Sequence, residues 1–130
     1  MTIPFYCALF AFLMNYLSKI PLMVAMKREG KGYDNKTPRE QQARLTGWGK
    51  RALAAHQNSF EITPVFVGCV LMGHLSNGNL EWSDRLAIIF VVSRVLYTAL
   101  YLADWDKFRS LIWGLGLACS FGIGLSSVIF

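Results

Sequence analysis

The sequence predicts an all-α integral membrane protein whose protomer is a bundle of four transmembrane helices. The composition is 54% hydrophobic and 14% aromatic, and the mean hydropathy is +0.36. A soluble chain of 130 residues could not bury so much apolar surface. The apolar residues fall into long blocks, and a helix needs about 20 of them to cross the hydrocarbon. We therefore predict one domain, residues 1–130, with spans near residues 4–26, 51–75, 85–104 and 108–130.

The first span, residues 4–26, is expected to be a retained helix rather than a signal peptide. No basic segment precedes its apolar run, and no small-residue cleavage site follows it. Pro21 should kink or loosen the final turns, because proline lacks a backbone donor and its ring crowds the preceding turn. Lys19 can extend toward the membrane boundary. Asn15 either forms a hydrogen bond within the bundle, which we favour, or belongs to a site.

A polar connection, residues 27–46, separates the first two spans and holds most of the positive charge. The net charge is +5, and eight of the thirteen Lys and Arg residues lie between Lys27 and Arg51. Basic residues beside a span mark the cytoplasmic side of a membrane. Nucleic-acid binding is not indicated, because the cations are not spread along a soluble face. Thr37 and Thr46 are candidate helix caps near the end of this connection.

The second span, residues 51–75, begins with an unusual number of polar side chains. At about 100° per residue, Arg51, Asn58 and Glu61 lie along one stripe of a helix, whereas His56 points away from it. Ionisable side chains near hydrocarbon are costly and usually mark a site or a buried pair. A cation, an amide and a carboxylate on a rigid element suit a small zwitterionic ligand. The same groups could instead hold helices together, and this span alone does not decide between the two.

A second polar stripe lies in the third span, residues 85–104, which we expect Ser83 and Asp84 to cap. Arg94 and Tyr101 are seven residues apart and therefore lie on nearly the same line of a helix. The stripe occupies the half of the span that is predicted to be cytoplasmic. Its members are Arg94, Tyr97, Thr98 and Tyr101.

The fourth span, residues 108–130, begins with Arg109 and Ser110 and carries no larger polar side chain beyond them. Small residues recur along it, and small residues let neighbouring helices approach closely. They are Gly114, Gly116, Ala118, Ser120, Gly122 and Gly124.

The predicted topology brings these polar segments together. Four spans place both chain ends outside, and they place the basic connection and residues 104–107 on the cytoplasmic side. The polar ends of the second, third and fourth spans then meet at one face of the membrane. That convergence favours a functional site over simple helix packing.

The three cysteines, Cys7, Cys69 and Cys119, lie inside apolar blocks. An odd number without Cys-x-x-Cys spacing argues against a disulfide framework or a zinc site. We interpret them as small packing residues and predict no metal site.

Two segments carry a resemblance to a known family: Arg51…His56-Gln57-Asn58-Ser59-Phe60-Glu61…Pro64-Val65-Phe66 and Arg94-Val95-Leu96-Tyr97-Thr98-Ala99-Leu100-Tyr101. They resemble the signatures of helices two and three in the MAPEG family, the membrane-associated proteins in eicosanoid and glutathione metabolism. Arg109 and Ser110 fall where that family carries an Arg at the start of helix four. The likeness covers nearly the whole chain, and the short basic connection looks like that of a bacterial branch.

The resemblance implies a homotrimer of four-helix protomers that binds glutathione between subunits at the cytoplasmic face of a bacterial inner membrane. It implies that the thiolate of glutathione conjugates lipophilic electrophiles or reduces lipid hydroperoxides. The partners would be further subunits, membrane lipids and a lipophilic substrate, with no nucleic acid. The catalytic residues would be Arg109, Tyr101 and Ser110. The glutathione-binding residues would be Arg51, His56, Asn58, Glu61, Arg94, Tyr97 and Tyr101.

Three functions are compatible with these residues. The leading hypothesis is a glutathione-dependent enzyme, because Arg forks suit carboxylates and a nearby guanidinium favours thiolate over thiol. The second is a non-catalytic membrane protein of the same fold that binds a lipid or another small anionic ligand. Ala54 favours the second, since mammalian glutathione-using members carry a further Arg there. A transporter is disfavoured, because the polar groups cluster at one face rather than lining a path.

Overall fold

The computed structural model describes residues 1–130 and contains helices but no strands. Four long helical segments follow one another in the order that the sequence predicts. The first of them is divided into α1 and α2, and the two shortest helices lie in the basic connection and at the C-terminus. The helices are α1 (Ile3–Leu17), α2 (Lys19–Glu29), α3 (Pro38–Ala43), α4 (Gly47–Leu75), α5 (Leu80–Leu102), α6 (Asp106–Gly124) and α7 (Ser126–Ile129).

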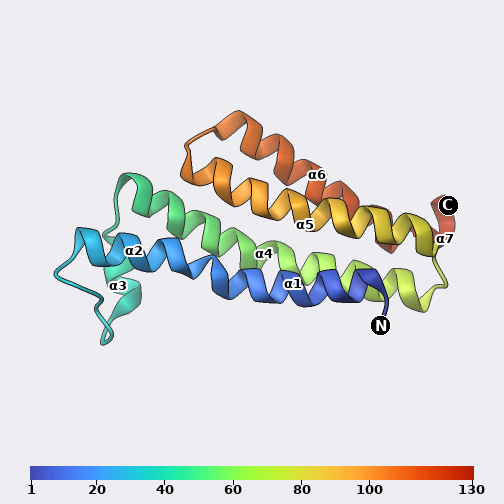
Figure 1. Ribbon diagram of the computed structural model, residues 1–130, viewed down its shortest axis with the longest axis horizontal. Coiled ribbons are helices and arrows are strands. Elements are labelled where there is room, and N and C mark those ends of the chain that lie inside the picture. The colour runs from blue at the N-terminus through green and yellow to red at the C-terminus, as the bar shows by residue number, and fades with distance from the viewer.

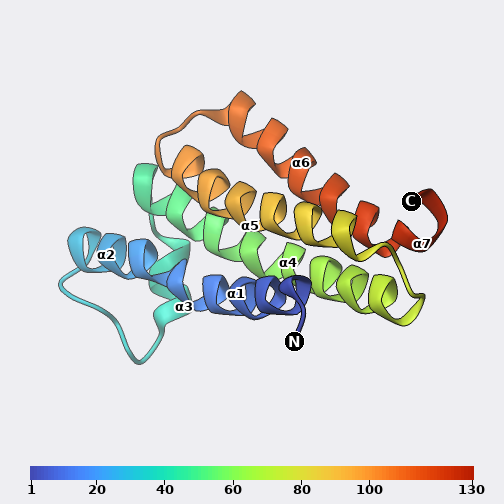
Figure 2. The same ribbon diagram turned by 45° about the vertical axis from the view of Figure 1, so that its right-hand side comes forward.

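The long segments lie side by side in an elongated molecule (Figure 1). Helix α4 packs against α1, α2, α5 and α6, while α5 and α6 form a hairpin along most of their length. Both chain ends and the turn between α4 and α5 lie at one end of the molecule. The connections from α2 to α4 and from α5 to α6 lie at the opposite end in both views (Figure 2). This arrangement agrees with the predicted up-and-down order of the segments.

Two helical segments are long and apolar enough to cross a membrane by length and composition: Ile3–Glu29 and Leu80–Leu102. Helices α4 and α6 occupy the other two predicted spans. They are less apolar, because α4 begins with charged and amide side chains and α6 begins with Asp106, Lys107 and Arg109. Membrane crossing by all four segments stays a prediction.

The first span is broken at Ser18, between α1 and α2. Pro21 lies three residues further on, has no N–H to offer to the Leu17 carbonyl, and crowds that carbonyl with its ring. The predicted distortion therefore occurs, but one turn before the proline rather than in the final turns. Helix α2 then continues to Glu29, so the polar connection begins later than predicted.

Asn15 forms a hydrogen-bonded junction between α1 and α4, as we favoured. Its Oδ1 atom accepts hydrogen bonds from Ser59 Oγ at 2.8 Å and from Thr63 Oγ1 at 2.9 Å. All three side chains are buried. Each buried hydroxyl thus has a partner, which such groups require away from water.

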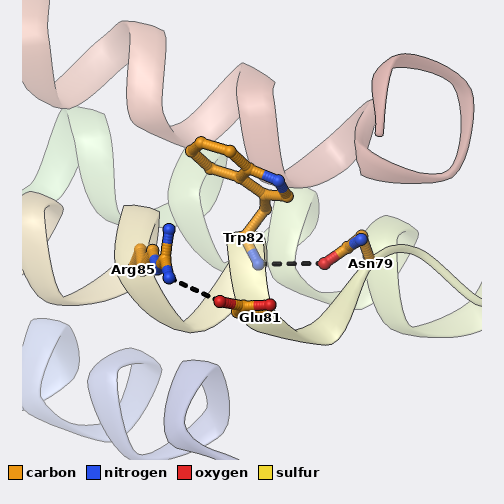
Figure 3. A network of polar contacts seen from close by, with 4 residues as sticks. All are labelled: Asn79, Glu81, Trp82 and Arg85. Carbon is orange, nitrogen blue, oxygen red and sulfur yellow. Dashed lines mark hydrogen bonds and ion pairs between the residues drawn. The ribbon is translucent and has the colours of Figure 1, made fainter.

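The predicted start and cap of the third span were wrong, whereas Thr37 and Thr46 are the N-cap residues of α3 and α4, as predicted. Helix α5 begins at Leu80, and its cap is Asn79, whose Oδ1 accepts from the Trp82 N–H at 3.1 Å (Figure 3). Ser83 and Asp84 lie inside the helix. Thr37 and Thr46 do precede α3 and α4, but neither hydroxyl bonds to the helix that follows it. Acidic side chains upstream, on Asp34 and Glu29, accept those hydroxyl protons instead.

Close packing between α4, α5 and α6 depends on glycines, as predicted for three of the four on α6. A Cβ atom built on Gly116 would lie 2.9 Å from Ser93 Oγ, and one on Gly124 would lie 3.3 Å from Cys69 Sγ. Gly122 likewise approaches Leu86, whereas Gly114 faces open space. The tightest backbone approach was not predicted: a Cβ on Gly73 of α4 would lie 2.5 Å from the Ile123 carbonyl oxygen.

Gly73→Ala is therefore expected to destabilise the protein by about 1–3 kcal/mol, the usual cost of forcing extra volume into a packed interior. The clash involves backbone, so no side chain can rotate to relieve it. The matched control is Gly114→Ala, also within a helix, which should be neutral or slightly stabilising because Ala favours helix. Thermal unfolding in detergent, followed by circular dichroism, measures both. Equal midpoints for the two variants would contradict the predicted contact.

Candidate functional site

The predicted polar segments of α4, α5 and α6 meet at the end of the molecule that carries the basic connection (Figure 1). They surround a hollow of about 210 Å³ on the protein surface. Its lining combines one amide, two phenols, one guanidinium, one hydroxyl and one indole. The lining residues are Asn58, Tyr97, Tyr101, Arg109, Ser110 and Trp113.

A chain of hydrogen bonds crosses from α5 to α4 beside this hollow. Arg94 Nη2 donates to Asn58 Oδ1 at 2.8 Å, and Asn58 Nδ2 donates to Glu61 Oε2 at 3.5 Å. The two partners orient the Asn58 amide, with its oxygen toward the cation and its NH₂ toward the carboxylate. Asn58 and Glu61 of the predicted stripe thus contact each other on α4, and Arg94 of α5 joins them.

Two tyrosine rings lie between two guanidinium groups along α5 and onto α6. The Arg94 guanidinium lies 4.2 Å from the centre of the Tyr97 ring. Tyr97 meets Tyr101 edge to face, with 5.6 Å between ring centres. The Arg109 guanidinium lies 4.2 Å from the centre of the Tyr101 ring. Contacts of this kind hold a guanidinium over the ring face, so the Tyr101 ring orients Arg109 at the edge of the hollow.

Arg94 is a supporting residue in this geometry rather than part of the surface of the hollow. Its side chain is only 5% exposed, and it is absent from the lining residues. Its Nη1 atom is buried without a hydrogen-bond partner. A buried charge is costly unless it is compensated, and the contacts with Asn58 and the Tyr97 ring supply part of that compensation.

Arg51 departs from the predicted stripe. Its Nη2 atom approaches the carbonyl oxygen of Leu102 at 3.5 Å, and its Nε atom is buried without a partner. The side chain is thus drawn toward the C-terminal end of α5 and does not line the hollow. The helical spacing placed Arg51 correctly on α4, but a neighbouring helix decides where its guanidinium lies.

His56 lies on a different side of α4, as the helical periodicity indicates, and is not brought together with Asn58. Its Nδ1 atom lies 2.8 Å from Ser18 Oγ, and its ring meets Phe60 edge to face. It lines a larger hollow of about 740 Å³, which Glu61 also lines. Glu61 therefore connects the two hollows, since it also accepts the hydrogen bond from Asn58. The other lining residues of this larger hollow are Tyr16, Lys19, Pro38, Arg39, Gln42, Leu53, Gln57 and Phe60.

Trp113 is the lining residue that sequence reasoning missed. It lies one helical turn beyond Arg109 on α6 and therefore faces the same side. The available signal in the sequence is its spacing of four residues from Arg109, the predicted catalytic residue. The surrounding residues of the fourth span are apolar, so Trp113 was not predicted to belong to the site.

Comparison with known proteins identifies the family of this chain. The model of the MAPEG family matches residues 3–129. The chain is a member of the MAPEG family. No curated protein and no solved structure matches it significantly. MAPEG proteins are membrane-associated, and the two apolar helical segments of this member are consistent with that.

Proposed function

We propose that this MAPEG protein is a glutathione-dependent membrane enzyme. Its substrates would be lipophilic electrophiles, which the thiolate conjugates, or lipid hydroperoxides, which it reduces. The observation that supports the proposal most directly is the placement of Arg109. Its guanidinium is stacked on Tyr101 at the edge of a hollow that Asn58 also lines. A cation held beside a small polar hollow is what an anionic sulfur nucleophile needs.

The residues of the two hollows match the charges of glutathione. Glu61 would bind the ammonium group. Arg39 and Lys19, which line the larger hollow with Glu61, are the cations placed to bind the carboxylates. Arg109 would favour ionisation of the thiol, with Tyr101 or Ser110 donating a hydrogen bond. In conjugation the sulfur attacks an electrophilic carbon and forms a C–S bond. The substrate then takes a proton from water or expels its leaving group.

We further propose that the active assembly is a homotrimer of membrane-spanning protomers, with glutathione between neighbours. The hollow beside Arg109 measures about 210 Å³, below the roughly 300–1,000 Å³ of ordinary small-molecule sites. A neighbouring subunit would enlarge and close it. The basic connection lies at the same end of the molecule (Figure 1), so the positive-inside rule assigns this end to the cytoplasmic side. The membrane would be a bacterial inner membrane.

Calorimetry with glutathione on the detergent-purified protein tests the proposal. We expect saturable binding, weakened about 10- to 100-fold in Glu61→Gln, because charge-assisted hydrogen bonds contribute about 1.5–3 kcal/mol. The matched control is Glu81→Gln, the same substitution at an exposed position. Glu81 lies on the first turn of α5, at the end of the molecule opposite the hollow. This variant should bind as the unmodified protein does. Absence of any glutathione binding would contradict the proposed function.

A non-catalytic member of the family is the second candidate, and Arg51 and Ala54 favour it. Arg51 is engaged at Leu102, and Ala54 supplies no cation one turn before Asn58. Such a protein would bind a lipid or another small anionic ligand without ionising a thiol. Ultraviolet absorbance separates the two, because only the enzyme should give a thiolate band from bound glutathione near neutral pH.

A further inference from the structure

The end of the molecule around the basic connection carries seven exposed cations, which we call the basic end. They lie on the last turn of α2, the connection to α4, α3 and the first turn of α4. None of them belongs to the hydrogen-bond chain at Asn58. The residues are Lys27, Arg28, Lys31, Lys36, Arg39, Arg44 and Lys50.

The acidic residues of this region offset only part of the charge of the basic end. Glu29 accepts hydrogen bonds from the Thr46 N–H at 2.9 Å and from its hydroxyl at 2.8 Å. Asp34 accepts from the N–H and hydroxyl of Thr37 and from the Lys36 N–H. The hydrogen bonds from Thr37, more than that from Lys36, hold the pKa of Asp34 below its usual range. Both carboxylates are thus used to organise the backbone.

No ion pair forms within the basic end. The only salt bridge in the molecule joins Arg85 to Glu81, on the first turns of α5 at the opposite end (Figure 3). Glu40 is the one further acid among residues 27–50, against seven cations. Together with Glu29 and Asp34 this makes three acids against seven cations, so the surface keeps a net positive charge that can attract anions.

Hydrogen bonds of one buried side chain organise the basic end. Gln41 is buried, and its Nε2 donates to the carbonyl oxygens of Met26 at 3.2 Å and Gly32 at 2.9 Å. Its Oε1 accepts from the Asp34 N–H at 2.9 Å. One side chain thereby ties the connection to the end of α2. The cations of the connection are thereby held next to those at the end of α2.

The basic end directly follows a segment suited to the membrane interior. Ile3–Glu29 is one of the two apolar candidate spans, and Ile20 and Val24 on α2 are exposed apolar side chains. With that segment in the bilayer, Lys27, Arg28 and the connection beyond them lie at the level of the lipid phosphates. A free inorganic phosphate is a poorer fit, because the hollow beside Lys31 and Arg44 is also lined by Glu29 and Asp34.

We propose that the basic end binds the headgroups of anionic phospholipids in the membrane that holds the protein. The proposal does not depend on glutathione binding. Clusters of Lys and Arg next to a membrane segment are attracted to anionic lipid, by roughly fivefold in affinity per cation. The predicted consequence is a preference for phosphatidylglycerol over phosphatidylcholine.

Native mass spectrometry of the full chain in mild detergent, titrated with each lipid, measures this preference. The test variant is Lys31→Gln/Lys36→Gln/Arg44→Gln, which should reduce the preference for phosphatidylglycerol by about 100-fold at the additive limit. The control is Arg85→Gln, which removes an exposed cation at the opposite end and should leave the preference unchanged. Equal loss in the control and the triple variant would overturn the proposal, since net charge alone would then decide binding.

A second measurement needs no substitution and so avoids any folding defect in the triple variant. Raising the salt concentration from 0.1 M to 1 M shortens the screening length from about 10 Å to about 3 Å. The preference of the unmodified protein for phosphatidylglycerol should then fall markedly. A preference that salt does not change would contradict binding through the basic end. Displacement of the lipid by millimolar inorganic phosphate at constant ionic strength would overturn it in favour of a soluble-phosphate site.

Discussion

Arg109→Ala is expected to lower turnover at neutral pH about tenfold while leaving glutathione affinity largely intact. The Arg109 guanidinium lies at the edge of the hollow, where it would favour the thiolate over the thiol. If it lowers the thiol pKa by one unit, its preferential interaction with the thiolate is about 1.4 kcal/mol. Losing it should move the thiolate titration to higher pH by a similar amount. Activity should then recover as the pH is raised.

Ultraviolet absorbance of bound glutathione, followed against pH in both proteins, measures this directly. Glu61→Ala gives the opposite pattern, because it should raise the glutathione requirement first and leave the titration midpoint in place. Arg109→Lys keeps a charge but loses the flat stack on Tyr101, so it should recover only part of the shift. An unmoved midpoint in Arg109→Ala would assign the thiolate role to another group or exclude a glutathione enzyme.

Two variants of Tyr101 distinguish whether its ring or its hydroxyl lowers the pKa of the glutathione thiol. Tyr101→Phe keeps the ring face that lies 4.2 Å from the Arg109 guanidinium, whereas Tyr101→Leu removes it. If the ring orients Arg109, the Leu variant should show the raised thiolate midpoint and the Phe variant should not. A raised midpoint in both would instead make the hydroxyl a hydrogen-bond donor to the thiolate.

The second large effect is expected at Arg94, although it does not line the hollow. Arg94→Gln should weaken glutathione binding about 5- to 100-fold, because it leaves the Asn58 amide without its charged donor and so misplaces the contact to Glu61. Loss of a partner from a buried polar group costs about 1–3 kcal/mol. The dissociation constant, measured by calorimetry, should change more than turnover at saturation.

A double-mutant cycle with Asn58→Ala distinguishes this relay from general destabilisation. Once Asn58 is removed, Arg94→Gln should have little further effect on glutathione binding, since residues in one hydrogen-bond network are not additive. Circular dichroism and the unfolding midpoint provide the folding control. Additive losses in the cycle would contradict the 2.8 Å contact as the route by which Arg94 acts.

The order and approximate positions of the long helices could be predicted, because long apolar blocks and breaks between them are local properties. The caps could not be predicted as well. Asn79 precedes α5 by one residue and bonds the Trp82 N–H, whereas Ser83 and Asp84 look equally suitable in the sequence. Which candidate caps a helix depends on where the chain turns, and the α4–α5 turn places Asn79 there. The division of the first span at Ser18 likewise differs by one turn from the position that Pro21 suggests.

The sequence by itself determined the contacts that lie within one helix. Asn58 meets Glu61, and Arg85 meets Glu81, because residues three or four apart share a helix face. Family membership also follows from the sequence, since the MAPEG family model matches residues 3–129.

Only the tertiary structure decided the contacts between helices. Periodicity sets the angle of a side chain around its own helix axis, but not the rotation or depth of the neighbouring helix. Arg94 on α5 therefore contacts Asn58 and does not line the hollow. Arg51, which was also predicted to bind glutathione, contacts the Leu102 carbonyl oxygen instead. Arg109 lies over Tyr101 because α5 and α6 form a hairpin. The close approach of α6 to α5 at Gly116, beside Ser93, contributes to those distances.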